Sequence, residues 1–362
     1  MQLKDSQPDQ LHKSLQDIVD NIQIQSNFCI SHPDYKPLEI LPSVVTRFQQ
    51  LPEEFQRKYL SLQLRNFIYC IYFKGDAPAA DAVEESSVLV QNSEDAAIAQ
   101  TLEIDWQLHK SNCGEGYFDP GWYILKQKSD GSLAVQKNGL TVHIQHDRHL
   151  QPEQLPRIGD TVAIRMPPNL VETGFYVAVG NAGLANLHSC DRQLKTVYIY
   201  FNFSPEGAIA LMHSLTEQLN YLKIGFTFKA LSDPANYPRN DAGVLYFENC
   251  NYKKVRQILQ TVYAENSAYF HPSIPLFTKR LAPGLSLAEK PEYKETTEER
   301  FGLNRCQIVA DGLLDAWHSG DNSAQGRMNA VARRFSRLEI DLQHPYLNAN
   351  SSDIYIPLDF DF

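Results

Sequence analysis

Hydrophobic residues in the first part of the chain recur at helical spacing. The pattern is carried by Leu11, Leu15, Ile18, Val19 and Ile22. Residues three or four positions apart share one face of a helix, so this spacing predicts an amphipathic helix. Apolar residues continue at helical spacing from Phe55 to Phe67 and lead into the apolar run 68–73. We therefore predict a mainly helical region up to about residue 75, followed over 74–95 by an exposed linker rich in Ala, Glu, Asp and Ser.

The period of the pattern changes to two between residues 117 and 144. Alternating segments flank Asp-Gly at 130–131 and Asn-Gly at 138–139, and both dipeptides readily adopt the positive φ angles of tight turns. Two successive hairpins are therefore expected. Two further strands, over 161–165 and 175–179, would complete an antiparallel, meander-like section.

The remainder of the chain mixes strands with helices. A strand over 197–203 precedes Ser204 and Pro205, which suit the N-cap and the first turn of a helix. The further elements that we predict are strands near 225–230 and 243–248, a helix near 251–265 and a last long helix over 298–317. These patterns predict an α+β protein, with a helical N-terminal region followed by a mainly antiparallel sheet region with packed helices.

Composition permits a large core and argues against several functions. The chain has 362 residues, of which 43% are hydrophobic, and a net charge of −10. Non-specific nucleic-acid binding requires a basic face, which this charge disfavours. The six cysteines lack the spacing of a zinc site or a disulfide framework, so we expect free thiols in a reducing cytoplasm. No apolar run approaches the roughly 20 residues of a membrane helix, and the N-terminus lacks a signal-peptide pattern.

Five cations between residues 225 and 305 lie inside or beside apolar runs. They are Lys229, Arg239, Lys279, Arg280 and Arg305. Lys and Arg are rarely buried without a partner, because the removal of an unpaired charge from water is costly. Several such cations in one segment suggest a shared anionic ligand, most simply a phosphate.

Each candidate also has a structural interpretation. Lys229 ends the strand motif Phe-Thr-Phe-Lys and is either a solvent-facing strand lysine or a cleft lysine that acts as a general base. Arg239 belongs either to a surface turn or to a bidentate phosphate clamp. Tyr246 lies in mid-strand, where a tyrosine is more often a core residue. Lys279 precedes a Pro-Gly loop whose amides could approach a ligand, and Arg305 suits a helix surface equally well.

Several established motifs are missing from the sequence. The glycine-bearing segment Asn112-Cys-Gly-Glu-Gly-Tyr117 matches neither a P-loop nor a dinucleotide fingerprint, and we interpret it as a loop that enters the hairpins. The sequence contains no H-E-x-x-H, no G-x-S-x-G and no kinase H-R-D or D-F-G. These absences argue against a metalloenzyme, a hydrolase and a kinase.

Several longer motifs occur in a fixed order between Trp106 and Trp317. They are Tyr117-Phe-Asp-Pro-Gly-Trp122, Gly174-Phe-Tyr-Val-Ala-Val-Gly180, Tyr200-Phe-Asn-Phe-Ser-Pro-Glu-Gly-Ala208, Phe226-Thr-Phe-Lys229, Pro275-Leu-Phe-Thr-Lys-Arg-Leu-Ala-Pro-Gly284, Leu287-Ala-Glu289 and Phe301-Gly-Leu-Asn-Arg-Cys306. In these motifs the chain resembles the HopA-type family, named for a type III secretion effector of plant-pathogenic bacteria. The resemblance implies two parts: 1–105, helical with an acidic linker, and 106–362, a HopA-like α+β catalytic region.

The resemblance also implies an activity. Family members in bacterial peptide natural-product pathways look like distant relatives of phosphothreonine lyases, so a phosphothreonine-lyase-like fold is expected. Their partners are a phosphorylated precursor peptide and a separate small kinase that resembles aminoglycoside phosphotransferases. The kinase phosphorylates Ser or Thr, and the lyase removes the phosphate by β-elimination to leave a dehydroamino acid, as in fifth-class lanthipeptides and thioamide-containing peptides. This chemistry implies no metal, no cofactor, no nucleic acid and no membrane.

The resemblance assigns roles to particular residues. By order and local pattern, Lys229 resembles the strand lysine that is the base of these lyases. Arg239 and Tyr246 resemble two of their phosphate ligands. Lys279 and Arg305 are our own expected phosphate contacts.

The chain departs from the lyase pattern at the general acid. The lyases carry a His on the strand before the base, whereas the corresponding strand here offers Tyr200 and Asn202. Asn202 could hold a phosphate oxygen, and His188 could stand in for the acid. Two functions therefore stay open: a metal-free phosphoserine/phosphothreonine lyase, and a non-catalytic module that binds a phosphopeptide or a protein, including a type III effector-like interaction protein.

Overall fold

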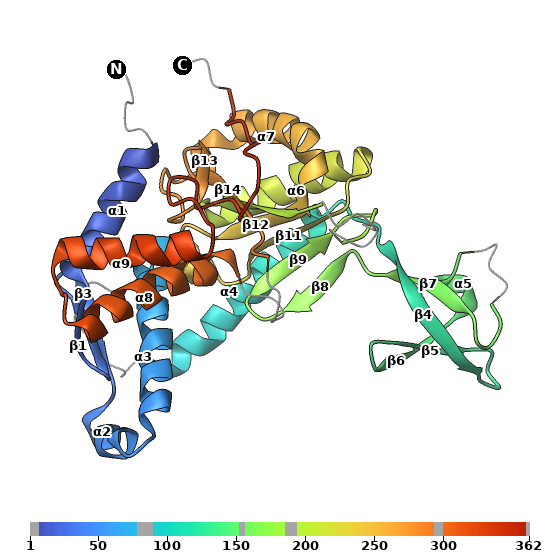
Figure 1. The fold of residues 1–362 in the computed structure, drawn as a ribbon. Helices are drawn as coiled ribbons and strands as arrows, with labels where there is room; N and C mark the ends of the chain where they lie inside the picture. Colours follow the sequence, from blue (N-terminus) through green and yellow to red (C-terminus); the bar gives the residue numbers. More distant parts are fainter. Residues whose placement is uncertain (1–6, 78–89, 152–155, 185–193, 293–299, 360–362) are drawn as a thin grey trace.

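The computed structural model describes residues 7–77, 90–151, 156–184, 194–292 and 300–359. Three antiparallel sheets and the helices packed around them form an α+β fold (Figure 1). The predicted fold class is therefore confirmed. In the described parts of the chain, no helix is both long enough and apolar enough to cross a membrane.

The N-terminal region combines helices with a small sheet. Its helices are α1 (Gln7–Asn21), α2 (Pro42–Gln49), α3 (Glu53–Ile68) and the π-helix η1 (Tyr69–Lys74). The strands β1 (Gln23–Ser26), β2 (Cys29–His32) and β3 (Tyr35–Glu39) form a three-stranded sheet between them. The predicted helix at the start of the chain is confirmed, but the prediction of a mainly helical region is wrong over 23–39. The three strands read QIQS, CISH and YKPLE, and these mostly polar segments lack the regular apolar alternation that predicts a strand.

Helix α4 (Val90–Ser111) connects the N-terminal region to the sheets. It begins inside the segment that we predicted to be a linker, so that prediction is wrong over 90–95. Residues 78–89 lie outside the described parts. The helix also crosses the predicted boundary between residues 105 and 106, so the two predicted parts share one continuous helix.

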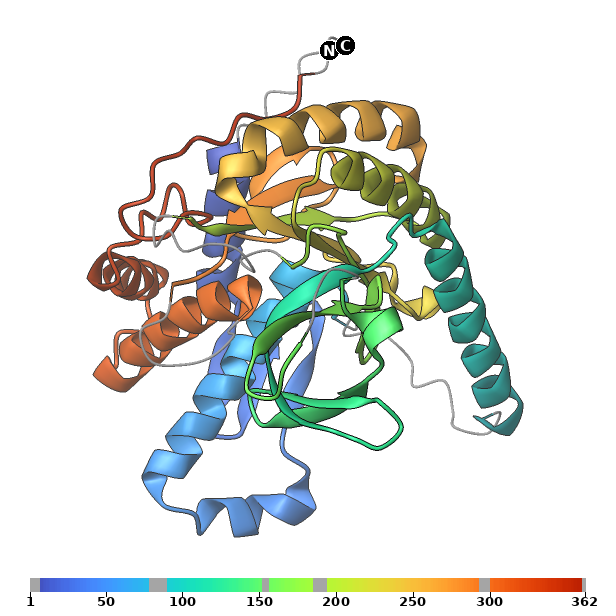
Figure 2. The same cartoon turned by 90° about the vertical axis from the view of Figure 1, so that its right-hand side faces the viewer.

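A four-stranded sheet projects from the body of the molecule in Figure 1 and faces the viewer in Figure 2. Its elements are β4 (Tyr117–Gln127), β5 (Leu133–Lys137), β6 (Leu140–Ile144), α5 (His146–His149) and β7 (Thr161–Met166). The two predicted hairpins are confirmed, and both Asn138 and Gly139 have the positive φ of a type I′ turn (49° and 81°). The predicted single meander is wrong, because β7 pairs with β4 and not with the strand that follows it.

The body of the molecule is a seven-stranded antiparallel sheet with strand order β13-β14-β10-β12-β11-β9-β8. Its strands are β8 (Asn169–Glu172), β9 (Phe175–Val179), β10 (Thr196–Phe201), β11 (Phe226–Leu231), β12 (Gly243–Glu248), β13 (Lys279–Ala282) and β14 (Leu285–Glu289). The strands predicted near 175–179, 197–203, 225–230 and 243–248 are confirmed. The segment predicted as a Pro-Gly loop is the tight turn of the β13–β14 hairpin.

Helices cover both faces of this sheet (Figure 1). The elements are α6 (Pro205–Tyr221), η2 (Pro234–Asn236), η3 (Asn249–Asn251), α7 (Tyr252–Asn266), η4 (Ser267–Tyr269), α8 (Phe301–Ser319) and α9 (Ala324–Arg337). The predicted cap of α6 is confirmed, because Ser204 Oγ accepts a hydrogen bond from Gly207 N at 3.2 Å. The prediction that α8 is the last helix is wrong. Helix α9 buries only a narrow stripe that includes Gly326 and Ala330, and such small residues give a weak apolar signal.

Strand alternation gives the two faces of the large sheet different chemistry. The Phe201 ring lies 5.4 Å from Phe228 and 6.4 Å from Phe270, which in turn lies 4.6 Å from Tyr263 of α7. The face toward α6 and α7 is therefore an apolar core. The opposite face is covered by η1 and α8, and Tyr200 on this face contacts Phe73 of η1 at 5.5 Å.

We predict that Gly312→Ala lowers the free energy of unfolding by about 1–3 kcal/mol, as overpacking does. A Cβ atom at Gly312 of α8 would lie 2.6 Å from the Cα of Val331 in α9, so the two helices would have to separate. Urea denaturation measures the effect. In an open helix the same change stabilises by about 1 kcal/mol, so a more stable variant would contradict the close packing of α8 on α9.

Candidate functional site

The register of the large sheet brings Lys229 and Tyr246 onto one face. Thr227 of β11 is paired with Tyr246 of β12, and Tyr246 is paired with Tyr198 of β10. Paired residues in antiparallel strands point to the same side, and Lys229 lies two positions after Thr227. Lys229, Tyr246 and Tyr198 therefore share the face that η1 and α8 cover.

Lys229 contacts three side chains of this face. Its Nζ lies 2.9 Å from Glu172 Oε1, 5.1 Å from the Phe175 ring centroid and 5.0 Å from that of Tyr246. The Lys229 side chain is only 13% exposed, so its charge is largely removed from water. The carboxylate and the two ring faces compensate for the lost hydration. We call these four residues the Lys229 cluster.

Tyrosines surround the Lys229 cluster on its inner side. Tyr198 lies 4.7 Å from Tyr246, measured between ring centroids, and 6.2 Å from Tyr200. Burial is the main cause that raises the pKa of Tyr246, Tyr200 and Tyr69 far above the usual value for tyrosine. These phenols are therefore neutral at physiological pH and keep a proton for hydrogen bonding.

A second ion pair lies on the η1 side of the Lys229 cluster. Arg239 donates to both carboxylate oxygens of Asp241, at 2.6 and 2.9 Å, and Tyr69 Oη donates to Asp241 Oδ2 at 3.3 Å. Burial tends to lower the pKa of Arg239, but the hydrogen bonds to Asp241 outweigh it and the pKa is raised. The charge of Arg300, an exposed residue at the start of α8, acts to lower the pKa of both Tyr69 and Tyr246.

Lys279 lies far from Lys229 and on the opposite face of the sheet. Three strands separate β13 from β11, which corresponds to roughly 20 Å at the usual strand spacing. Lys279 Nζ is 2.5 Å from Asp353 Oδ2 and 5.2 Å from the ring centroid of Tyr346, whose hydroxyl also donates to Asp353. The neighbouring Arg280 donates to Gln10 Oε1 at 3.0 Å. The structure therefore does not bring Lys279 and Lys229 to a shared ligand.

Arg305 lies in the core, where it is 1% exposed. Its guanidinium donates to Pro345 O at 2.7 Å, to Leu347 O at 2.8 Å and to the side chain of Asn304. The guanidinium also lies over the Phe301 ring, with 4.9 Å between its central carbon and the ring centroid. These contacts fasten the segment after α9 to α8, which is a structural role.

Asn202, directly after β10, is also buried, and its amide donates to one side chain and to one backbone carbonyl. Its Nδ2 donates to Asn240 Oδ1 at 3.1 Å and to Ser273 O at 3.0 Å. Asn240 in turn donates to Phe73 O, so these amides connect β10 to η1. The last sequence candidate, His188, lies outside the described residues.

Four residues in or near the Lys229 cluster were not predicted from the sequence. Glu172 and Phe175 come from the β8–β9 hairpin, and no local signal connects that hairpin to β11. Tyr198 could have been found, because alternation along its strand places it on the same face as Tyr200. Arg300 could have been suspected as a cation in the first turn of a predicted helix.

A cavity of about 480 Å³ borders the Lys229 cluster at the edge of the sheet. Glu172 and Phe175 line it together with residues of α4, including Leu102 and Trp106. The side chains of Leu102 and Trp106 are 63% and 58% exposed, and Val171 on the same hairpin is fully exposed. The cavity therefore opens to solvent with an apolar rim, and it reaches the Lys229 cluster through Glu172 and Phe175 while Lys229 itself does not line it.

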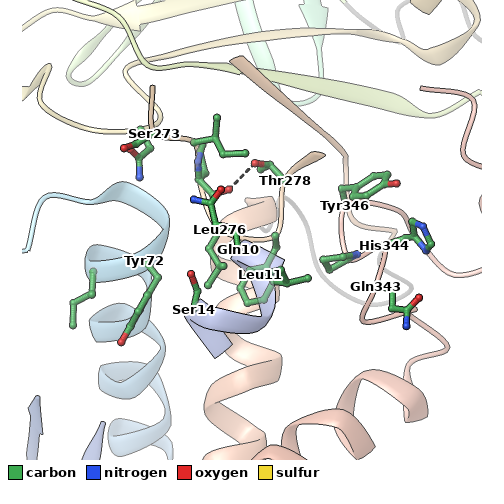
Figure 3. A pocket seen from close by; sticks show the side chains of 16 residues that line it. Gln10, Leu11, Ser14, Tyr72, Ser273, Leu276, Thr278, Gln343, His344 and Tyr346 are labelled. Atoms are coloured by element: carbon green, nitrogen blue, oxygen red, sulfur yellow. Dashed lines mark hydrogen bonds between the residues drawn. The ribbon is translucent and has the colours of Figure 1, made fainter. Parts of the chain in front are cut away.

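A second cavity, of about 330 Å³, lies between α1, η1 and the loops 273–278 and 343–346 (Figure 3). The described side chains that line it include no Asp, Glu, Lys or Arg. Phe277 in its wall has a φ of 70°, a strained value for an aromatic residue, and Thr278 Oγ1 braces this turn by donating to Pro275 O at 2.6 Å. The uncharged lining suits a neutral ligand and not a phosphate.

Comparison with known proteins connects this chain to one family. The model of the HopA1 effector protein family matches residues 166–347, about half of the chain. A structure titled as the effector protein from Pseudomonas syringae pv. tomato strain DC3000 is similar, with 17% identity, a TM-score of 0.43 and coverage of 85% of this chain and 98% of that chain. The effector protein from Pseudomonas syringae pv. syringae strain 61 has 14% identity with the same TM-score and coverage. A search of curated proteins finds no match.

We predict that Arg305→Met lowers the free energy of unfolding by about 2–4 kcal/mol, because it leaves the buried carbonyl groups of Pro345 and Leu347 without a donor. Chemical denaturation measures the effect. Arg333→Met, at an exposed position of α9, is the matched control and should change stability by less than about 0.5 kcal/mol. Equal effects of the two substitutions would contradict the structural role of Arg305.

We also predict a defined pH dependence for the Lys279–Asp353 pair. Burial tends to raise the pKa of Asp353, but hydrogen bonds from Lys279 and Tyr346 outweigh it and hold the pKa below its usual range. The pair therefore contributes stability above the unfolded-state pKa of about 3.9, and this contribution is lost as the pH falls through the lower folded-state pKa. Denaturation midpoints measured at several acidic pH values should fall less steeply for Asp353→Asn than for the wild type. Identical slopes would contradict the assignment.

Proposed function

We propose that this chain, which belongs to the HopA1 effector protein family, is a metal-free phosphoserine/phosphothreonine lyase that acts on a peptide. The observation that carries the proposal is the Lys229 cluster, in which a largely buried lysine faces a neutral tyrosine on the adjacent strand. A β-elimination requires a base for the α-proton and donors or cations for the departing phosphate. Lys229 is the proposed base, and Tyr246 is one of the proposed donors to the departing phosphate.

The proposed reaction requires Lys229, an ammonium while it is paired with Glu172, to lose one proton before it acts as the base. The amine takes the α-proton of the phosphorylated residue, the electrons of the Cα–H bond form the Cα=Cβ double bond, and the Cβ–O bond breaks. The departing oxygen takes a proton from water, so that phosphate leaves as the hydrogenphosphate dianion. Tyr246 donates a hydrogen bond to a phosphate oxygen throughout, because its raised pKa keeps the phenol protonated. Arg300, and Arg239 behind Tyr69, supply the positive charge that balances the dianion.

Glu172 holds Lys229 while the site is empty. A phosphate dianion beside Tyr246 would repel this carboxylate, and the Glu172 side chain is 37% exposed, so it has solvent to move into. Displacement of Glu172 would release Lys229 Nζ toward the α-carbon of the substrate. In this proposal Glu172 of the β8–β9 hairpin keeps Lys229 ion-paired until the phosphate binds.

The peptide is proposed to cross the β8–β9 edge of the sheet, with its phosphorylated residue on the face of Lys229 and its flanking residues in the 480 Å³ cavity between α4 and this hairpin. Its exposed rim of Leu102, Trp106 and Val171 offers apolar contact for residues that flank the phosphorylated one. The partner that supplies this substrate is a separate kinase resembling aminoglycoside phosphotransferases, which phosphorylates Ser or Thr of a precursor peptide. The dehydroamino acid left behind is the product expected in peptide natural-product biosynthesis.

A second candidate function is a binding module without catalysis, including an effector-like interaction protein. The observation in its favour is that both central cations already have carboxylate partners, Lys229 in Glu172 and Arg239 in Asp241. Such a module would bind a phosphopeptide or an acidic protein and release it unchanged.

We predict that wild-type protein removes the elements of phosphoric acid from a phosphothreonine or phosphoserine peptide, and that Lys229→Ala abolishes this loss. Mass spectrometry of the incubated peptide gives the readout. Lys279→Ala is the matched control, since Lys279 is an equally buried strand lysine (14% against 13% exposed) that is paired with a carboxylate and an aromatic ring. The control should keep nearly full activity.

Three other outcomes would contradict either the lyase activity or the role of Lys229 in it. Loss of phosphate with the hydroxyl restored would identify a phosphatase. An unchanged peptide whose binding is weakened by Tyr246→Phe would identify the binding module. Equal loss of activity in both lysine variants would remove Lys229 from its proposed role.

A further inference from the structure

The loop after α4 places a thiol, an imidazole and a carboxylate in a row. Cys113 Sγ lies 3.2 Å from Nδ1 of His213, and His213 Nε2 lies 3.9 Å from Oε2 of Glu217. His213 and Glu217 are one turn apart on α6. With its proton on Nε2, directed toward Glu217, the imidazole presents Nδ1 as an acceptor for the thiol proton. This row lies on the α6 side of the sheet, whereas the Lys229 cluster lies on the opposite face.

Backbone contacts hold Cys113 in this position. Its N–H donates to Thr216 Oγ1 at 2.9 Å, and Thr216 is fully buried in α6. The amide of Asn112 accepts from Gly114 N at 2.9 Å and donates to Pro168 O at 3.1 Å. A Cβ at Gly114 would lie 2.9 Å from the Pro168 side chain, so glycine is required for this close approach. The approach of Cys113 to His213 is therefore fixed by the fold.

The row of side chains is accessible from solvent. Cys113 is partly exposed, and the side chains of His213 and Glu217 are 59% and 63% exposed. Neither Cys113 nor His213 lines either of the two cavities described above. A small dissolved reactant can reach the sulfur, and neither of these two cavities encloses it.

We propose that Cys113 is a reactive thiol that undergoes exchange with small disulfides of the glutathione type. In the exchange, His213 Nδ1 takes the proton from Sγ, and the thiolate attacks one sulfur of the disulfide. A new S–S bond forms to Cys113 as the original S–S bond breaks. The departing thiolate takes the proton from the imidazolium, so no further oxidant is needed. Glu217 is a positioning residue that stabilises the imidazolium.

The test follows modification of the whole protein by oxidised glutathione near neutral pH, with each cysteine quantified by peptide mass spectrometry. Cys250 is the internal reference, because it is exposed, and burial followed by the charge of Glu248 raises its pKa. Cys113 should react about tenfold faster than Cys250, because His213 Nδ1 lies 3.2 Å from Cys113 Sγ and can take its proton during the attack. Equal rates, or a faster Cys250, would overturn the proposal.

A His213→Gln variant separates activation from simple exposure. The substitution should slow the modification of Cys113 to about the rate of Cys250 and leave the Cys250 rate unchanged. Glu217→Gln should cause a smaller decrease. His213 is mostly exposed, so the variant should keep the wild-type thermal transition, and a folded variant with an unchanged Cys113 rate would contradict the assigned role of the imidazole.

Discussion

Strand alternation across β10, β12 and β11 is the constraint on which the rest of the molecule depends. One set of positions, which includes Phe201 and Phe228, forms the apolar core beneath α6 and α7. The intervening positions must then face η1 and α8, and these positions carry Tyr246 and Lys229. A slip of one residue in register would exchange the two faces and bury the charge in the phenylalanine core. The stability of the core therefore fixes the geometry of the proposed site.

The second principle of this structure is that Lys229, Lys279, Arg239 and Arg305 are each compensated locally. Lys229 and Lys279 each combine a carboxylate with an aromatic ring, Arg239 forms a bidentate pair, and Arg305 donates to main-chain carbonyls. Compensation of this kind accounts for cations inside apolar runs without one shared anion. The location of the compensating partner also distinguishes these cations from one another. Only the partner of Lys229 belongs to an edge hairpin that borders an open cavity.

The sequence predicts the parts of the fold that local chemistry determines. The hairpin turns near residues 131 and 139 and the cap at Ser204 follow from residues that favour one backbone conformation. The sheet over 23–39 and the narrow helix α9 were not predicted, because both contain few large apolar residues in a regular pattern. The approach of Lys229 to Tyr246 follows from alternation on two neighbouring strands. The roles of Glu172 and Arg305 depend on partners distant in the chain, and main-chain carbonyl partners carry no sequence signal at all.

The central claim is that a phosphorylated residue binds between Lys229 and Tyr246. The most direct test is a crystal structure with a peptide that carries α-methylphosphoserine, which has no α-proton and therefore cannot undergo elimination. The account predicts a phosphate oxygen within hydrogen-bond distance of Tyr246 Oη, the substituted α-carbon facing Lys229 Nζ, and Glu172 moved away from the lysine. A phosphate bound elsewhere, with the 2.9 Å contact between Lys229 and Glu172 intact, would contradict the account.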